Sequence, residues 1–118
     1  MSLDVSLTVP KPGQSTANVS AETMELYSSN ITHSLGKMAK EAGIYEHLWQ
    51  PEEIGIKKAK QLIEPLTAGL ALMQSDRARF ETFNAPNGWG TYKNFIPFIK
   101  SYIEACREYP EADVSVSC

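Results

Sequence analysis

Two short stretches of alternating polarity constrain the fold of this chain most. Residues 3–9 place an apolar side chain at every odd position and a polar one at every even position. Residues 112–118 alternate again, with Val114 and Val116 on the apolar side. Successive side chains of a strand point to opposite faces, so each stretch predicts a half-buried strand. We expect the first and last strands to pair.

The segment between these strands is mainly helical in pattern. Residues 22–28 predict a second strand, although they also fit a helix. Residues 31–42 carry apolar residues at intervals of four, three and four, which is helical spacing. Asn30, or Ser29 one residue earlier, is the expected N-cap, and Gly43 the expected stop. Further helices are expected at 44–49, from Gln50 with a kink or break at Pro65, after Ser75, and over 91–108, regular only from Asn94 or Phe95 because of Pro97.

These elements define one fold class. We predict an α+β fold, in which a small, mainly antiparallel sheet of the N- and C-terminal strands packs against three to four helices. The length of 118 residues, with 42% hydrophobic and 21% charged residues, fits a single globular domain over 1–118. Two strands alone are marginal, so such a sheet needs helices on one face or the edge of a partner.

Charge and apolar patterning exclude several functions. The net charge of −3 gives no electrostatic reason to bind nucleic acid. No apolar run is long enough to cross a membrane, and Met1–Asp4 lacks the basic start of an export signal. We therefore expect a cytoplasmic protein without a membrane or nucleic-acid partner.

Motifs for metals and cofactors are absent from the sequence. Cys106 and Cys118 are too few for a disulfide framework. His33 and His47 stand in no metal-binding spacing, and no phosphate-binding loop, dinucleotide fingerprint or serine elbow occurs. The sequence predicts neither a metal nor a cofactor.

The densest cluster of polar side chains is the stretch from Tyr27 to His33. Ser29, Asn30, Thr32 and His33 surround the expected start of the helix, where unpaired amides can hold a small anion. Helical geometry places His33 opposite the apolar stripe, on the side of two lysines at positions 37 and 40. Three interpretations stay open: ordinary capping, a small-ligand or anion site, and catalysis with His33 as general base.

Trp89 is the second candidate, because it lies between two glycines that permit a sharp turn. The indole is either presented to a ligand or partner, or folded into the core.

Four stretches together resemble a family of small uncharacterised bacterial and phage or prophage proteins. They are residues 30–39, with the pattern N-x-T-H-x-L-x-x-M, residues 42–45, residues 48–53, and residues 87–92, with the pattern N-G-W-G. The resemblance covers most of residues 22–118 and implies a shared fold and a bacterial or phage origin. It carries no known activity. Relatives often have Asn at the position of Ser34, which weakens any mechanism that depends on that amide.

Two functions follow from these observations. The first is a small, non-enzymatic binding or interaction protein, whose partner is a small anion, another protein, or a second copy joined through a sheet edge. The alternative is a small-ligand or nucleotide-handling enzyme that uses His33 at a helix N-terminus.

Overall fold

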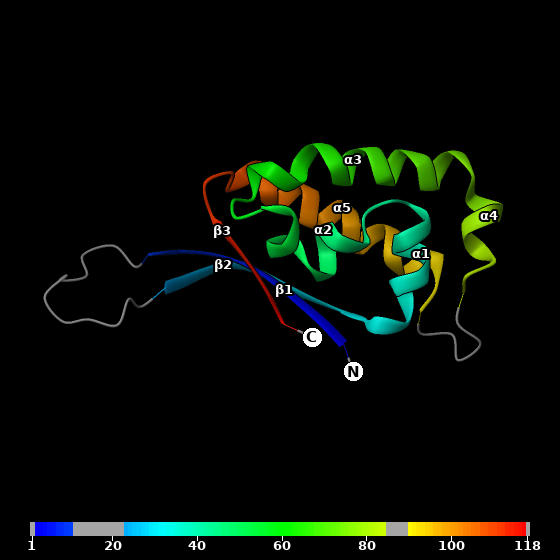
Figure 1. The fold of residues 1–118 in the computed structure, drawn as a ribbon, viewed down its shortest axis with the longest axis horizontal. Helices are drawn as coiled ribbons and strands as arrows, with labels where there is room; N and C mark the ends of the chain where they lie inside the picture. Colours follow the sequence, from blue (N-terminus) through cyan, green and yellow to red (C-terminus); the bar gives the residue numbers. More distant parts are fainter. Residues whose placement is uncertain (1, 11–22, 85–89, 118) are drawn as a thin grey trace, which may run out of the picture.

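The sheet has three antiparallel strands, with the first strand in the middle (Figure 1). The computed structural model describes residues 2–10, 23–84 and 90–117. Strand β1 (Ser2–Pro10) pairs on one side with β2 (Thr23–Thr32) and on the other with β3 (Asp113–Ser117). The expected pairing of the first and last strands is confirmed, and so is the α+β class.

Five α-helices and two short 3-10 helices, η2 and η3, lie between β2 and β3 in the described residues. Several are single turns, which explains why they outnumber the three or four predicted. Their bounds are His33–Leu35 for η2, Gly36–Glu41 for α1, Tyr45–Trp49 for α2, Pro51–Ile54 for η3, Lys60–Ser75 for α3, Arg77–Glu81 for α4 and Tyr92–Glu108 for α5.

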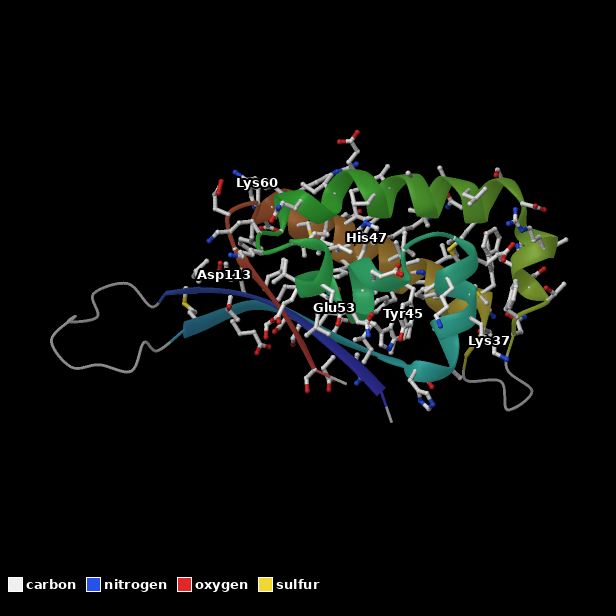
Figure 2. All side chains as sticks on the ribbon, in the orientation of Figure 1. Lys37, Tyr45, His47, Glu53, Lys60 and Asp113 are labelled. Carbon is white, nitrogen blue, oxygen red and sulfur yellow. The ribbon has the colours of Figure 1, made fainter. Side chains whose placement is uncertain are left out.

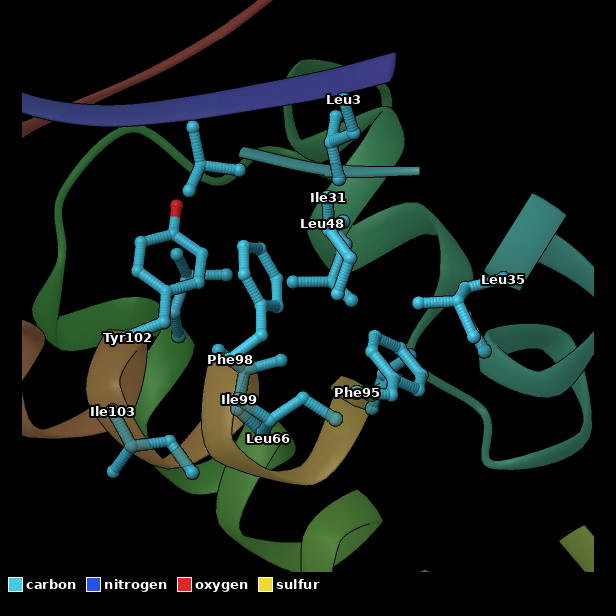
Figure 3. Close-up of a cluster of buried hydrophobic side chains, with 14 of the residues drawn as sticks. Leu3, Ile31, Leu35, Leu48, Leu66, Phe95, Phe98, Ile99, Tyr102 and Ile103 are labelled. Carbon is cyan, nitrogen blue, oxygen red and sulfur yellow. The ribbon is translucent and has the colours of Figure 1, made fainter. Parts of the chain in front are cut away.

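The helices cover one face of the sheet in layers. Helix α5 contacts β2 on one side and α3 on the other, so α3 is the layer farther from the sheet (Figure 1). Helix α2 contacts both α3 and β3. Leu3, Val5 and Leu7 of β1 are all buried in the cluster that the helices form with the sheet. Figure 3 shows Leu3 in this cluster.

Strand β2 continues further than the sequence predicted, and this displaces the first helix. Ser29, Asn30 and Ile31 pair with residues of β1, and helical backbone begins only at His33. Asn30 and Ser29 are therefore not N-caps, and the predicted helix over 31–42 is wrong at its start. Its end is as expected, because Gly43 adopts a left-handed φ of 77° directly after the C-cap residue of α1.

Both internal prolines lie within continuous helices. Helix α5 begins at Tyr92, where the Oγ1 of Thr91 accepts a hydrogen bond from the Asn94 amide at 3.3 Å. The expected late start is therefore wrong. A proline inside a helix costs roughly 3 kcal/mol. The nine buried residues of α5 offset this cost, because each large apolar side chain contributes about 1.5–3 kcal/mol. Helix α3 likewise continues through Pro65 without the expected break.

Within residues 2–10, 23–84 and 90–117, no helix is long and apolar enough to span a bilayer.

Candidate functional site

The predicted polar cluster is divided between two parts of the molecule. Asn30 lies on β2, where its Nδ2 donates a hydrogen bond to the Oδ1 of Asp4 at 2.6 Å. Ser29 lies beside it, in a shallow hollow over the sheet that also includes Asp4. His33 is exposed at the start of η2 and lines a different and larger groove. The stretch therefore does not form one site.

Thr32 is the residue that caps the helical segment. Its Oγ1 accepts a hydrogen bond from the Ser34 amide at 3.4 Å and lies 3.2 Å from the Ser34 hydroxyl. A threonine at this position satisfies one of the amides that a helix start leaves unpaired. Thr32 thus has a structural role, and it holds His33 and Ser34 at the mouth of the groove.

The groove lies between the α1–α2 segment and the residues that follow α4, and has a volume of about 720 Å³. This volume is within the range typical of small-ligand sites. Lys37 of α1 and Tyr45 of α2 lie at this end of the molecule, away from Lys60 and Asp113 (Figure 2). The described lining consists of His33, Ser34, Gly36, Lys37, Lys40, Tyr45, Trp49, Thr82, Phe83 and Asn84.

Aromatic rings form one wall of this groove. Tyr45 and Trp49 are four residues apart on α2, so they lie on the same side of the helix. Their rings stack with centroids 5.2 Å apart and planes 9° apart. Trp49 is buried, whereas Tyr45 and Phe83 are half-buried and available at the surface. The wall therefore offers an apolar surface on which a planar ligand can stack.

The charge of the groove is opposite to that of the whole chain. Its described lining has two lysines and a histidine but no aspartate or glutamate, although the net charge is −3. The nearby Glu41 is bound by the Arg79 guanidinium and lies outside the lining. The Lys40 ammonium lies 4.7 Å from the centroid of the Tyr45 ring, a cation–π geometry. The groove is therefore suited to an anion.

His47 does not belong to the lining, although α2 carries it. Its Nδ1 is buried and has no hydrogen-bond partner among the described residues. Burial lowers the pKa of His47, and the nearby Glu46 opposes that shift. In the part of the chain that the structure describes, no three His, Cys, Asp or Glu side chains gather as a metal site would require.

The sequence pointed to His33 but missed the aromatic wall. The predicted helix over 44–49 includes Tyr45 and Trp49, but nothing in that prediction gave them a place in a site. Their spacing of four residues, beside Lys40, is the signal that could have identified them. Trp89 lies outside the described residues, so its two interpretations stay open.

Comparison with known proteins gave no match: no protein-family model, no curated protein and no solved structure is similar to this chain. The resemblance to small bacterial and phage proteins stays a prediction.

Proposed function

We propose that this protein is a non-enzymatic binding protein, and that its groove holds a small ligand with an anionic group and a planar ring. The observation that carries the proposal is the composition of the described lining. Two lysines and a histidine face the same hollow as three aromatic rings, and no carboxylate stands among them. Sites for small ligands commonly combine an apolar wall with a few convergent polar groups.

The two lysines of the groove are the reason to expect an anionic group on the ligand. Lys40 is held over the Tyr45 ring, so part of the conformational freedom of its long side chain is already restricted. A cation ordered in advance binds an anion at a smaller entropic cost. Lys37, one helical turn away on the same helix, is exposed and has no ion-pair partner among the described residues. Together the two ammonium groups favour a phosphate or carboxylate.

The aromatic wall accounts for the planar ring. Stacking of aromatic rings contributes about 0.5–1.5 kcal/mol beyond the burial of area. Tyr45 and Phe83 keep part of their surface exposed in the groove, whereas Trp49 supports Tyr45 from beneath the surface. A nucleoside monophosphate has both required parts, a ring and a dianion.

His33 is exposed in the same lining, and its imidazole can form a hydrogen bond with the ligand. The alternative, a nucleotide-handling enzyme, requires turnover of the bound ligand that is lost in the His33→Ala variant.

Calorimetric titration tests the proposal with four probes: adenosine monophosphate, adenosine, benzoate and inorganic phosphate. We expect the monophosphate to bind more tightly than adenosine or phosphate alone, and to weaken as salt screens the lysines. Lys40→Ala and Tyr45→Ala should each weaken binding about threefold to tenfold, as partly exposed contacts of roughly 1 kcal/mol do.

The matched control is Lys100→Ala, because Lys100 is equally exposed but lies on α5 outside the groove. It should leave the affinity unchanged. Equal binding of adenosine and its monophosphate would refute the anionic half of the proposal, and no binding by any of the four probes would refute the whole.

A further inference from the structure

The two edges of the sheet are protected very differently. Strand β3 is the shorter edge, and residues 57 and 58 lie against its start. The Val114 amide donates to the Lys57 carbonyl at 2.9 Å, and the Lys58 ammonium forms an ion pair of 2.7 Å with Asp113. Charged residues and covering segments are ways in which proteins block unwanted strand pairing. The β3 edge is therefore partly closed.

Strand β2 forms the other edge and has twice the length, ten residues against five. From Leu26 to Thr32 it contains no charged residue and no proline. A register shift between Leu7 and Thr8 of β1 disturbs the pairing only in the first half of β2. The second half is a regular, uncharged edge strand, the kind that pairs readily with another strand.

The direction of the backbone groups on β2 follows from the pairing of its neighbours. Because the Val114 amide points to Lys57, away from β1, the next residue Ser115 directs its N–H and C=O toward Ser6. The N–H and C=O of Ser6 therefore point toward β3. The pair of Ser6 with Ser28 is then the non-hydrogen-bonded kind, and Ser28 directs its N–H and C=O outward. No described residue forms a backbone hydrogen bond with them.

We infer that the outer edge of β2 pairs antiparallel with β2 of a second copy around Ser28, so that two three-stranded sheets join into one of six strands. A twofold axis at Ser28 lets each copy donate its Ser28 amide to the Ser28 carbonyl of the other. Such an interface is self-complementary, as twofold dimers require. About this axis the uncharged residues 26–30 lie opposite the same residues of the second copy, so no like charges are opposed there.

The inference is independent of the groove, because His33 and Lys37 do not enter it. Its test is the molar mass of the whole chain in solution by light scattering and sedimentation, from micromolar to millimolar concentration. We expect the mass to rise from that of one chain, 13.1 kDa, toward twice that value. Hydrogen exchange of the Ser28 amide should slow over the same range.

Two variants and one control locate the interface. Ser28→Pro removes the outward amide and leaves the pairing with β1 intact, because an edge strand tolerates proline where its N–H faces outward. Ser28→Lys retains the amide and places two like charges at the axis. Each should weaken dimerisation at least tenfold. Ser115→Lys is the matched control, because Ser115 is exposed in the same cross-strand row at the opposite edge.

Circular dichroism checks that each variant is folded, and Ser28→Lys alone carries the test if Ser28→Pro does not fold. A wild-type chain that stays monomeric at millimolar concentration overturns the inference. So does a dimer that both Ser28 variants leave intact, or one that Ser115→Lys weakens as strongly as Ser28→Lys.

Discussion

The two faces of the sheet differ in burial and in the polarity of their side chains. On the inner face of β1, Leu3, Val5 and Leu7 are fully buried against the helices. On the outer face, the row of Ser28, Ser6 and Ser115 carries only hydroxyls, and its two edge members are exposed. The polarity of the outer face needs no ligand to explain it, because one face of an antiparallel sheet commonly meets water. Polar density on a strand is thus weaker evidence for a site than polar density in a groove.

The largest expected effect compares adjacent residues on opposite faces. Leu7→Ala should lower the free energy of unfolding by about 2–5 kcal/mol, because it removes buried methyl groups and leaves a cavity. Thr8→Ala, which alters the half-exposed outer face, should cost less than about 1 kcal/mol. Urea unfolding followed by circular dichroism measures both. Similar losses in the two variants would show that the faces are not distinct in energy.

A smaller effect extends the comparison to the buried and exposed sides of α3. A Cβ added at Gly69 would lie 2.5 Å from the Cγ2 of Ile44, which precedes α2, so the Ile44 side chain or the backbone of α3 would have to shift. Gly69→Ala should therefore cost about 1–3 kcal/mol, although alanine favours helices by about 1 kcal/mol over glycine. Ala68→Gly, on the exposed side, is the control and should cost only that 1 kcal/mol. If Gly69→Ala stabilises the protein, propensity outweighs packing here.

The smallest effect concerns a polar atom on the inner side. The Tyr102 hydroxyl is buried, has no hydrogen-bond partner among the described residues and is turned toward the sheet (Figure 3). A buried hydroxyl without a partner costs about 1–3 kcal/mol. Tyr102→Phe should therefore leave stability at neutral pH unchanged or slightly higher. A loss above 1 kcal/mol in urea unfolding would indicate a partner that contradicts this assignment.

The same variant has a pH dependence of definite sign. Burial raises the pKa of Tyr102 above its ordinary 10.0, so the unfolded chain releases this proton at lower pH than the folded chain. Stability from Tyr102 is therefore present below pH 10 and is lost as pH rises above it. Burial also raises the pKa of Cys106, from 9.0 to about 12, with a loss of the same sign over that interval. Tyr102→Phe should lose less stability than wild type on alkaline titration.

The strands and the core helices could be predicted because their patterns are local. Alternation over residues 3–9 marks the buried face of β1, and the apolar stripe through Leu35 and Met38 marks residues that are indeed buried. The start of the first helix could not be predicted in the same way. Ile31 fits a period of two as well as a period of three or four, and only its pairing with Leu3, far away in the chain, decides for the strand.

Prediction of the groove from the sequence would have required long-range information of the same kind. His33 could be placed on an exposed side from helical spacing alone. Phe83 and Asn84 follow α4, some fifty positions later, and nothing in their local sequence connects them with His33. The late helix start expected from Pro97 was wrong for a related reason. Burial of the apolar side of α5 outweighs the local preference against proline in a helix.

The central position of β1 has a consequence for how the chain acquires its structure. Its pairing with β2 joins Pro10 to Thr23, thirteen positions apart, but its pairing with β3 joins Thr8 to Asp113, more than a hundred positions apart. Contacts of such long range form slowly. During synthesis from the ribosome, β1 can pair with β2 early, and one side of β1 must then wait until almost all of the described chain has been made. Until β3 has been made, the second edge of β1 is unpaired in the nascent chain, and unpaired strand edges are prone to aggregation.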